Sequence, residues 1–251
     1  MSSTMTSLRW EDQVALITIR RPDKRNALNF ELCTELIDVV SGVLDEGARV
    51  LVFTGEGSSF CSGADLDTVY TPEFRGALYR LLGLVTNAPV PVIAAVNGPA
   101  IGAGTQLAIA ADLRVVTPSA AFAVPTAKLG LAVDPWTVRR LALLVGNAPA
   151  RSMLLACEQV SAEDALRFGL AQRMGSPNEA VTWARTLAEL APLTLAYNKK
   201  VLNAAFEPEF DPTDAVGKEL YDAFEACWDS EDFAEARQAR AEKRHPKFTG
   251  R

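Results

Sequence analysis

The residues that first suggest chemistry in this chain are small. Gly102, Ala103 and Gly104 stand where an apolar run, residues 91–96, gives way to a helical pattern. Small residues at such a turn let a ligand approach backbone N–H groups, and the N-terminus of a helix adds partial positive charge. The turn is therefore suited to stabilising an oxyanion. A tight turn required only by sterics would carry the same residues, so these three do not identify a ligand site on their own.

The chain offers few side chains for acid–base or nucleophilic catalysis. Its single histidine, His245, is in the C-terminal tail, which argues against Ser-His-Asp and Cys-His catalysis because both need a central imidazole. The four cysteines are scattered without a C-x-x-C pair, which predicts reduced thiols, no disulfide framework and no metal site. Gln106, just after the turn, carries an amide that forms hydrogen bonds but cannot act as a base near neutral pH. Acid–base chemistry must therefore fall to carboxylates, lysine, tyrosine or water.

Strand and helix patterns alternate through the first part of the chain. Apolar runs predict buried strands at residues 14–19, 50–53, 91–96 and 113–116. Helical periodicity predicts helices between them at residues 30–44, 72–86 and 103–111. This alternation indicates an α/β arrangement. The strand signal nearly vanishes from residue 135, and residues 177–241 are overwhelmingly helical. We expect an α/β core over residues 1–190 and a helical C-terminal part over residues 191–251.

Composition narrows the choice of partners. The 251 residues are 49% hydrophobic and 22% charged, which is enough for a sizeable core. The net charge of −6 argues against nucleic acid or an anionic membrane as a general partner, while a local basic patch could still bind one anionic cofactor. Residues 1–13 are polar and lack the apolar centre of a signal peptide, and no stretch approaches the roughly 20 apolar residues of a spanning helix. A cytoplasmic protein without membrane insertion is predicted.

A second loop of small residues supports a ligand role for the Gly-rich turn, since residues 60–66 run Phe-Cys-Ser-Gly-Ala-Asp-Leu. With this loop and the turn, the chain resembles the enoyl-CoA hydratase/isomerase (crotonase) superfamily over essentially its whole length. Further segments that carry the resemblance are residues 21–28, 89–98, 111–114 and 242–248. The resemblance implies an α/β fold of the crotonase type, which is a spiral of ββα units. It also implies a C-terminal helical trimerisation region, with either a homotrimer or a hexamer of two paired trimers as the assembly.

The resemblance implies a site for the thioester of a fatty acyl-CoA. The superfamily's oxyanion hole falls on the backbone N–H groups of Ala64 and Ala103, and removal of one such donor typically lowers the rate by about a hundred- to a thousandfold. Coenzyme A enters as part of the substrate, with no permanently bound cofactor. The residues on which its site falls, or whose charge suits its phosphates, are Lys24, Arg25, Ala27, Ala64, Asp65, Leu66, Lys243 and Lys247, the last two from a neighbouring subunit. Taken singly, each of these cations is more often a solvated surface residue.

The chain departs from the superfamily at both hydratase carboxylates. Gln106 and Thr126 occupy their positions, and each such acid–base group usually contributes about a hundred- to ten-thousandfold to the rate. A normal hydratase rate is therefore not expected. We expect Gln106, Thr126, Leu129 and Trp136 to line the substrate pocket instead.

Asp134 is the one carboxylate that remains near the expected site. In dienoyl-CoA isomerases of the superfamily, an aspartate at the matching position serves as the base. Aspartate followed by proline, here Pro135, is also typical of a helix N-cap and the first helical residue. The sequence leaves both roles open.

Two functions are compatible with these residues. The chain resembles an actinobacterial subgroup that lacks both glutamates, which implies an acyl-CoA-binding protein of fatty-acid and lipid metabolism with weak or no hydratase activity. Such a protein would sequester thioesters or deliver them to other fatty-acid-pathway enzymes. The alternative is an active acyl-CoA double-bond isomerase with Asp134 as its base. A peptidase of the related Clp type, or a coenzyme A-dependent dehalogenase, would need a histidine at the site, and His245 is in the wrong place.

Overall fold

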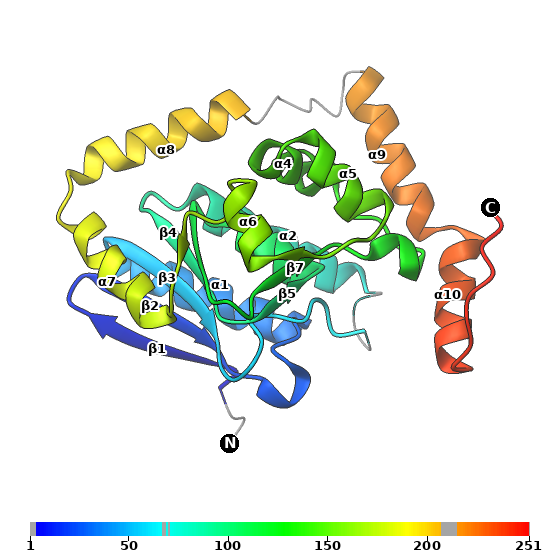
Figure 1. Ribbon diagram of the computed structural model, residues 1–251, viewed down its shortest axis with the longest axis horizontal. Helices are drawn as coiled ribbons and strands as arrows, with labels where there is room; N and C mark the ends of the chain where they lie inside the picture. The colour runs from blue at the N-terminus through cyan, green and yellow to red at the C-terminus, as the bar shows by residue number, and fades with distance from the viewer. Residues whose placement is uncertain (1–3, 67–68, 70, 207–214, 251) are drawn as a thin grey trace. The chain divides into compact units, whose positions relative to one another are not determined.

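The protein divides into two compact units in the computed structural model (Figure 1). The structure describes residues 4–66, 69, 71–206 and 215–250. The first unit comprises residues up to 123 together with 160–203, and the second comprises 124–159 together with the residues from 204 onward. The second unit is therefore built from two segments that are far apart in the sequence. The predicted division at residue 190, between an acyl-CoA-binding core and an oligomerisation region, stays a prediction.

The larger sheet of the first unit has six strands in the order β1-β2-β3-β4-β6-β9. Its strands are β1 (Thr6–Glu11), β2 (Val14–Ile19), β3 (Val50–Gly55), β4 (Val92–Val96), β6 (Leu113–Val116) and β9 (Arg173–Met174). β1 and β2 are antiparallel, and the other neighbours are parallel. A smaller sheet has the order β5-β7-β8, formed by β5 (Pro99–Ile101), β7 (Ala121–Ala123) and β8 (Val160–Ser161). The four predicted strands are confirmed, whereas β1 lies in a segment that was expected only to be polar.

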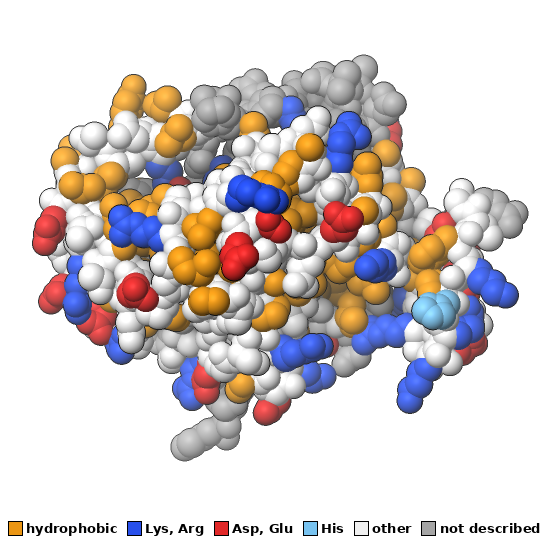
Figure 2. Space-filling model, viewed as in Figure 1, with side chains coloured by type: hydrophobic (Ala, Val, Ile, Leu, Met, Phe, Trp, Pro, Cys, Tyr) orange, Lys and Arg blue, Asp and Glu red, His pale blue; other side chains and the backbone are white. Residues whose placement is uncertain are grey.

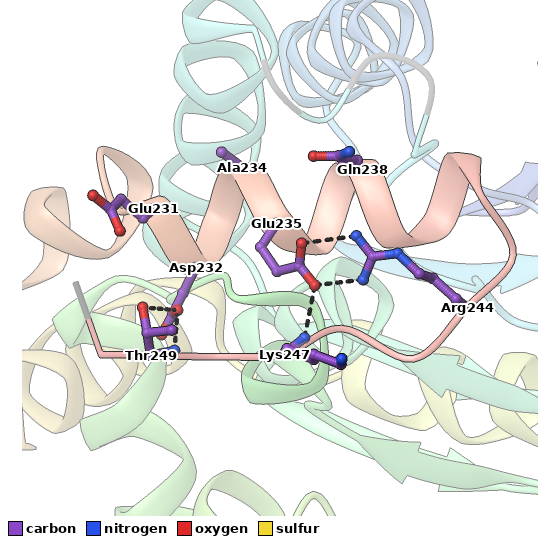
Figure 3. A pocket seen from close by; sticks show the side chains of 8 residues that line it. All are labelled: Glu231, Asp232, Ala234, Glu235, Gln238, Arg244, Lys247 and Thr249. Atoms are coloured by element: carbon purple, nitrogen blue, oxygen red, sulfur yellow. Dashed lines mark hydrogen bonds and ion pairs between the residues drawn. The ribbon is translucent and has the colours of Figure 1, made fainter.

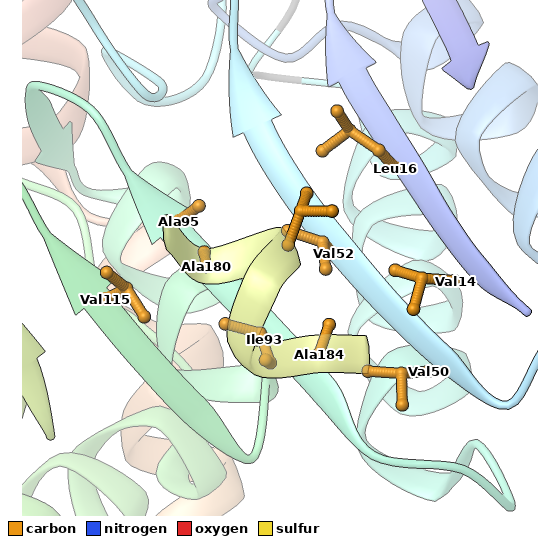
Figure 4. Close-up of a cluster of buried hydrophobic side chains, with 10 residues drawn as sticks. Val14, Leu16, Val50, Val52, Ile93, Ala95, Val115, Ala180 and Ala184 are labelled. Carbon is orange, nitrogen blue, oxygen red and sulfur yellow. The ribbon is translucent and has the colours of Figure 1, made fainter. Parts of the chain in front are cut away.

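Both faces of the larger sheet are buried at its central strands β2, β3 and β4. Successive residues of a strand point to opposite faces, and in β3 neither Val50 on one face nor Leu51 on the other is exposed. On the first of these faces, the strands pack against Ala180 and Ala184 of α7 (Pro177–Ala188) (Figure 4). The small alanine side chains let the helix approach the sheet closely. A sheet buried on both faces explains why its strands have apolar runs rather than alternating patterns.

The three helices predicted from periodicity are confirmed as α1 (Phe30–Asp45), α2 (Pro72–Asn87) and α3 (Ala103–Ala110). The first unit also contains α6 (Ala162–Arg167), the 3-10 helix η1 (Pro22–Lys24) and most of α8 (Pro192–Phe206). α8 is anchored through Lys199, whose Nζ donates to the carboxylate of Asp112 at 2.8 Å and to the carbonyl of Val90 at 3.1 Å. Asp112 therefore has a structural role, because its carboxylate holds α8 in place.

The described residues of the second unit form helices and no strand. They are the 3-10 helix η2 (Thr126–Leu129), α4 (Pro135–Val145), α5 (Asn147–Leu155), α9 (Ala215–Trp228), α10 (Glu231–Ala241) and the end of α8. The Trp228 ring packs edge-on against Phe224 and Phe233, with centroids 6.4 and 5.5 Å away. Aromatic contacts therefore join α9 to α10 within this unit. Among the helices described here, none has the length and apolar character that a membrane crossing would need.

Candidate functional site

The Gly-rich turn joins β5 directly to α3. Gly102 has φ 53° and ψ −115°, a conformation open mainly to glycine, and its N–H donates to the carbonyl of Ala123 at 2.8 Å. The hydroxyl of Thr105 lies 2.7 Å from the carbonyl oxygen of Ala100 and 2.9 Å from that of Ala123, which ties the first turn of α3 to β5 and β7. No side chain caps the N-terminus of α3, so its first N–H, that of Ala103, is left for another acceptor.

The loop that precedes α2 pairs with the segment around Leu28. The N–H of Leu28 donates to the carbonyl of Gly63 at 2.8 Å, and the N–H of Asp65 donates to the carbonyl of Leu28 at 2.6 Å. These two bonds form a parallel bridge between Leu28 and Ala64. Because successive N–H groups of an extended chain point in opposite directions, the N–H of Ala64 points away from Leu28.

The two predicted oxyanion donors lie on neighbouring segments. Cys61 makes a parallel bridge to Ala100, and a Cβ placed on Gly63 would lie 3.9 Å from the N atom of Ala103. The loop therefore runs beside the start of α3. In the part of the chain that the structure describes, neither the N–H of Ala64 nor that of Ala103 donates a hydrogen bond. Two uncommitted donors on adjacent segments meet one requirement for binding an oxyanion.

Glycines hold the loop against the turn by direct backbone contact. A Cβ on Gly104 would lie 2.1 Å from the carbonyl oxygen of Cys61, and a Cβ on Gly98 would lie 2.1 Å from that of Ser58. Such distances are far below van der Waals contact, so glycine is required at both positions. Sterics therefore explain Gly104, whereas the dihedral angles explain Gly102. The steric role and the suitability for a ligand coexist at this turn.

Two asparagines that were not singled out from the sequence also fix the loop. The side chain of Asn97 accepts from the N–H of Gly55 at 3.1 Å and donates to its carbonyl at 2.8 Å. Asn26, fully buried, donates to the carbonyl of Ser59 at 2.7 Å. Its φ of 59° is in the left-handed region, where asparagine is enriched. The signal that could have found both residues is their place in the motif segments noted above.

The same pairing gathers most of the residues predicted to bind coenzyme A. Ser62 donates through its N–H to the carbonyl of Arg25 at 2.9 Å and through its hydroxyl to the carbonyl of Lys24 at 3.2 Å. Lys24 and Arg25 are exposed, whereas Ala27 is buried. The loop paired with them carries the other predicted residues of this unit, which are Ala64, Asp65 and Leu66. Two consecutive exposed cationic residues therefore lie beside the loop that presents the Ala64 N–H.

Gln106 lies three residues after Ala103 and so on the same side of α3. Its side chain is only 4% exposed, and its backbone N–H donates to the carbonyl of Gly102 at 3.0 Å. A neutral amide in this place can orient a polar group by hydrogen bonding. It cannot remove a proton.

The remaining predicted pocket residues belong to the second unit. Thr126 and Leu129 are the first and last residues of η2, Trp136 is the second residue of α4, and all three are partly buried. Asp134 is the N-cap of α4, because its carboxylate accepts from the N–H of Thr137 at 3.1 Å and from its hydroxyl at 2.7 Å. The N-cap role considered from the sequence is confirmed, and the role of a base stays a prediction.

Lys243 and Lys247 lie in a tail that folds back along α10. Arg244 makes a two-pronged ion pair with Glu235 at 2.6 and 2.9 Å, and the N–H of Lys247 donates to the same carboxylate at 2.7 Å (Figure 3). Asp232 accepts two further N–H groups of the tail. Residues of α10 and the tail line a cavity of about 520 Å³. Figure 2 shows basic side chains gathered near the single histidine, which also belongs to this tail.

The shifted titratable groups near these segments do not provide a nucleophile. Hydrogen bonds from Arg244, and then from the Lys247 N–H, lower the pKa of Glu235 to about 2. Burial is the main cause that raises the pKa of both Cys33 and Cys61 to about 12. Both thiols are therefore neutral at physiological pH and unreactive as nucleophiles. Among the described residues, no group of histidine, cysteine and carboxylate side chains is arranged to hold a metal ion.

Comparison with known proteins gives matches along nearly the whole chain. The sequence profile of the family described as enoyl-CoA hydratase/isomerase matches residues 9–251. The chain is 45% identical over 249 residues to the "Probable enoyl-CoA hydratase echA6" of Mycobacterium tuberculosis, which covers 98% of this chain and 100% of the relative. It is similar to the crystal structure of an enoyl-CoA hydratase from Mycobacterium avium subsp. paratuberculosis, with a TM-score of 0.84, 29% identity and coverage of 98% and 99%. A methylmalonyl-CoA decarboxylase, 22% identical, has a TM-score of 0.90 over 100% of both chains, which shows a shared fold.

Proposed function

The chain belongs to the enoyl-CoA hydratase/isomerase (crotonase) family and has its α/β fold, and from this premise we propose that it binds fatty acyl-CoA thioesters through a backbone oxyanion hole. The donors are the N–H groups of Ala64 and Ala103. The observation that carries the proposal is that these two N–H groups lie on adjacent segments and donate to no acceptor within the described residues. A thioester oxygen that accepts both bonds is stabilised most when negative charge develops on it. The hydratase names of the relatives support a thioester as the ligand class.

We further propose that hydratase activity is weak or absent. Gln106 and Thr126 stand where the family resemblance places the two catalytic glutamates. Neither an amide nor a hydroxyl can accept and return a proton near neutral pH as a carboxylate can. Gln106 is buried and can orient a ligand or a water molecule, so the site keeps the means to bind a thioester while it lacks the means to hydrate it.

The restoration of one carboxylate is not expected to create an efficient hydratase. In Gln106→Glu the partner position is still Thr126, and catalytic groups that act as a unit are strongly non-additive. Steady-state hydration of crotonyl-CoA by this variant should stay far below the rate of an ordinary family hydratase. A rate within about tenfold of such an enzyme would contradict the proposal that both carboxylates are needed.

The role that fits these properties is to hold fatty acyl-CoA, or to deliver it to other enzymes of fatty-acid metabolism in the cytoplasm. Coenzyme A would be bound as part of the thioester, with Lys24 and Arg25 beside the Ala64 loop. Both cations are exposed and close to the segment that presents the oxyanion donor. Guanidinium and ammonium groups there suit the phosphates of the coenzyme.

We propose that the protein is a homotrimer, or a hexamer of two trimers, with residues 191–251 as the oligomerisation region and residues 1–190 as the acyl-CoA-binding core. Leu193 and Tyr197 of α8, which are 85% and 66% exposed, support an interface there. Light scattering at micromolar concentration tests the assembly, and a monomer would contradict it.

An active acyl-CoA double-bond isomerase with Asp134 as base is the second candidate. The observation that favours it is a carboxylate that is only 9% exposed. One base can carry a proton between the alpha and gamma carbons of a bound thioester. The helix cap argues against Asp134 as a base, because both of its carboxylate oxygens already accept hydrogen bonds from Thr137.

Binding and turnover measured on the same ligands distinguish the two candidates. The purified protein is titrated with a series of enoyl-CoA thioesters by calorimetry, and loss of the enoyl thioester absorbance is followed in parallel. Micromolar binding without turnover supports the carrier. Turnover that disappears in Asp134→Asn supports the isomerase, and the fold should survive this change because asparagine caps helices as well as aspartate does. The absence of any thioester binding would overturn both.

A further inference from the structure

We propose that Arg21 is a positioning residue for the thioester site. By bonding at once to both segments that flank the Ala64 peptide, it sets the direction of the Ala64 N–H. The inference rests on the proposed function, because it concerns the geometry of the oxyanion hole assigned there.

The contacts of Arg21 join two loops. Its NH1 group donates to the carbonyl of Ala27, and its NH2 group donates to the carboxylate of Asp65 at 3.1 Å. The two charged side chains are only 16% and 11% exposed, so water screens this pair much less than a surface ion pair. A guanidinium can hold two acceptors in fixed directions, whereas an ammonium is a point charge on a flexible stem. The side chain is therefore a rigid link between the loops.

The link closes a ring of bonds around one peptide. Ala27 precedes Leu28, and Leu28 is bridged through its N–H and carbonyl to the residues on either side of Ala64. Asp65 follows Ala64 and takes part twice, through its N–H to Leu28 and through its carboxylate to Arg21. The Ala64 N–H belongs to the Gly63–Ala64 peptide, so a rotation of that peptide would break the bond from the Leu28 N–H to the Gly63 carbonyl. Arg21 holds the Ala27–Leu28 peptide that makes this bond through the Ala27 carbonyl, and it holds Asp65, the residue after Ala64, through its carboxylate. Arg21 therefore opposes the motion that would turn the Ala64 N–H away from a bound carbonyl.

The neighbouring residue supplies a matched control. Arg20 makes an ion pair with Glu56 at 2.6 Å, but its side chain is 47% exposed and the pair lies outside the ring of bonds around Ala64. Replacement of Arg20 removes the same charge one position away. The two variants Arg21→Gln and Arg20→Gln therefore separate the loss of a positive charge from the loss of the link.

The test compares two ligands that differ only at the carbonyl. A saturated acyl-CoA thioester and the S-alkyl-CoA thioether of equal chain length share all coenzyme and chain contacts, and only the thioester can accept from the oxyanion hole. In Arg21→Gln the ratio of thioester to thioether affinity should fall by about tenfold, the value of one charge-assisted hydrogen bond. Arg20→Gln should leave the ratio unchanged, and Arg21→Lys should give an intermediate value. The infrared carbonyl stretch of a bound ¹³C-labelled thioester should move toward its solution frequency in Arg21→Gln.

The outcomes separate this inference from the proposed function. If Arg21→Gln weakens both ligands equally and leaves the carbonyl frequency unchanged, Arg21 is only structural and the inference is wrong. If Arg21→Gln does not fold, the affinity ratio of Arg21→Lys decides, since that variant keeps the charge. If the unmodified protein binds thioester and thioether equally well, the oxyanion hole itself is absent and the proposed function fails first.

Discussion

The loop beside α3 and the tail beside α10 are both held against a helix, but by contacts of different kinds. In the first unit, the carbonyl of Cys61 packs against Gly104 where a Cβ would lie only 2.1 Å away. In the second unit, Glu235 holds Arg244 through an ion pair whose side chains are 21% and 36% exposed. One contact is close packing of backbone atoms, and the other is a pair of charges at the surface.

These two kinds of contact respond to different changes. Close backbone packing has no room for an added methyl group, yet salt and moderate changes of pH do not weaken it. An ion pair at the surface tolerates substitution and is weakened by salt. The proposed oxyanion hole therefore lies where the geometry is least adjustable, and the basic tail lies where it is most adjustable.

The substitution Gly104→Ala should have the largest effect, because its methyl group would overlap the Cys61 carbonyl oxygen. The overlap forces the loop and α3 apart, and we expect the free energy of unfolding to fall by about 3 kcal/mol or more. Urea denaturation followed by circular dichroism measures this change.

The matched control is Gly83→Ala in α2, where an added Cβ meets nothing within 4 Å. Alanine in a helix interior is better than glycine by roughly 0.5–1 kcal/mol, so this variant should be slightly more stable. If both glycine variants were equally stable, the proposed overlap between a methyl group at position 104 and the Cys61 carbonyl oxygen would be contradicted.

The substitution Ala103→Pro should separate binding from stability. Proline is tolerated at the first position of a helix, and Gly102 with its ψ of −115° avoids the α region that proline excludes for its predecessor. We expect the oligomer and the melting temperature to be nearly unchanged. Acyl-CoA binding should weaken by about a hundredfold or more, because one oxyanion donor is lost and a ring projects toward the ligand.

The controls for this variant are free coenzyme A and Ala103→Gly. Free coenzyme A lacks the carbonyl and should lose much less affinity, and Ala103→Gly keeps the N–H and should bind acyl-CoA nearly normally. Equal losses of acyl-CoA and free coenzyme A would mean that the turn is only structural.

The fold could be predicted where its determinants are local. The strands β2, β3, β4 and β6 are apolar runs because both faces of the sheet are covered, and the periodicity of α1 and α2 comes from one buried face each. β1 was missed because most of its residues are exposed or only partly buried, which leaves no apolar run. The grouping of residues 124–159 with the C-terminal helices depends on contacts between distant segments, and no local pattern records it.

The candidate site shows the same limit. Gly102, Ala103 and Gly104 could be found because a turn before a helix is a local pattern. The motif segment 21–28 contains Arg21 and Asn26, but their contacts could not be predicted, because their partners Asp65 and Ser59 are 44 and 33 positions away. Whether a polar side chain is a surface residue or a link depends on what the fold brings next to it.

Alkaline pH should affect the first unit before the tail. The pKa of Cys33 and Cys61 is raised from 9.0 to about 12 by burial, so the thiols favour the folded state fully below pH 9 and lose this contribution as the pH rises toward 12. At pH 10 we expect the free energy of unfolding to be about 1 kcal/mol lower per thiol than at pH 8.

Two cysteine variants test this assignment. Cys33→Ala destabilises the core but should make the free energy of unfolding depend less on pH, whereas Cys227→Ser, at an exposed thiol, should leave this dependence unchanged. An identical pH dependence in Cys33→Ala would contradict this assignment.

The smallest effect on stability is expected for Glu235→Gln, which should release the tail without unfolding the protein. Glu235 accepts from Arg244 and from the Lys247 N–H, and its pKa is lowered from 4.5 to about 2. A lowered pKa means that the stabilisation is complete above pH 4.5 and is lost as the pH falls through about 2, so the tail should stay bound from pH 7 to pH 5. In the variant, the Lys247 amide should exchange its hydrogen several times faster than in the unmodified protein. Raising the salt concentration from about 0.05 to 0.5 M should speed this exchange in the unmodified protein by a similar factor.

The control is Glu242→Gln. Glu242 accepts one hydrogen bond from Arg244, from its Nε at 2.6 Å, so this variant loses one contact while the two-pronged pair with Glu235 remains, and it should speed the exchange less. Equal exchange in both variants and at both salt concentrations would show that charges do not hold the tail, and the contrast between the two units would not stand.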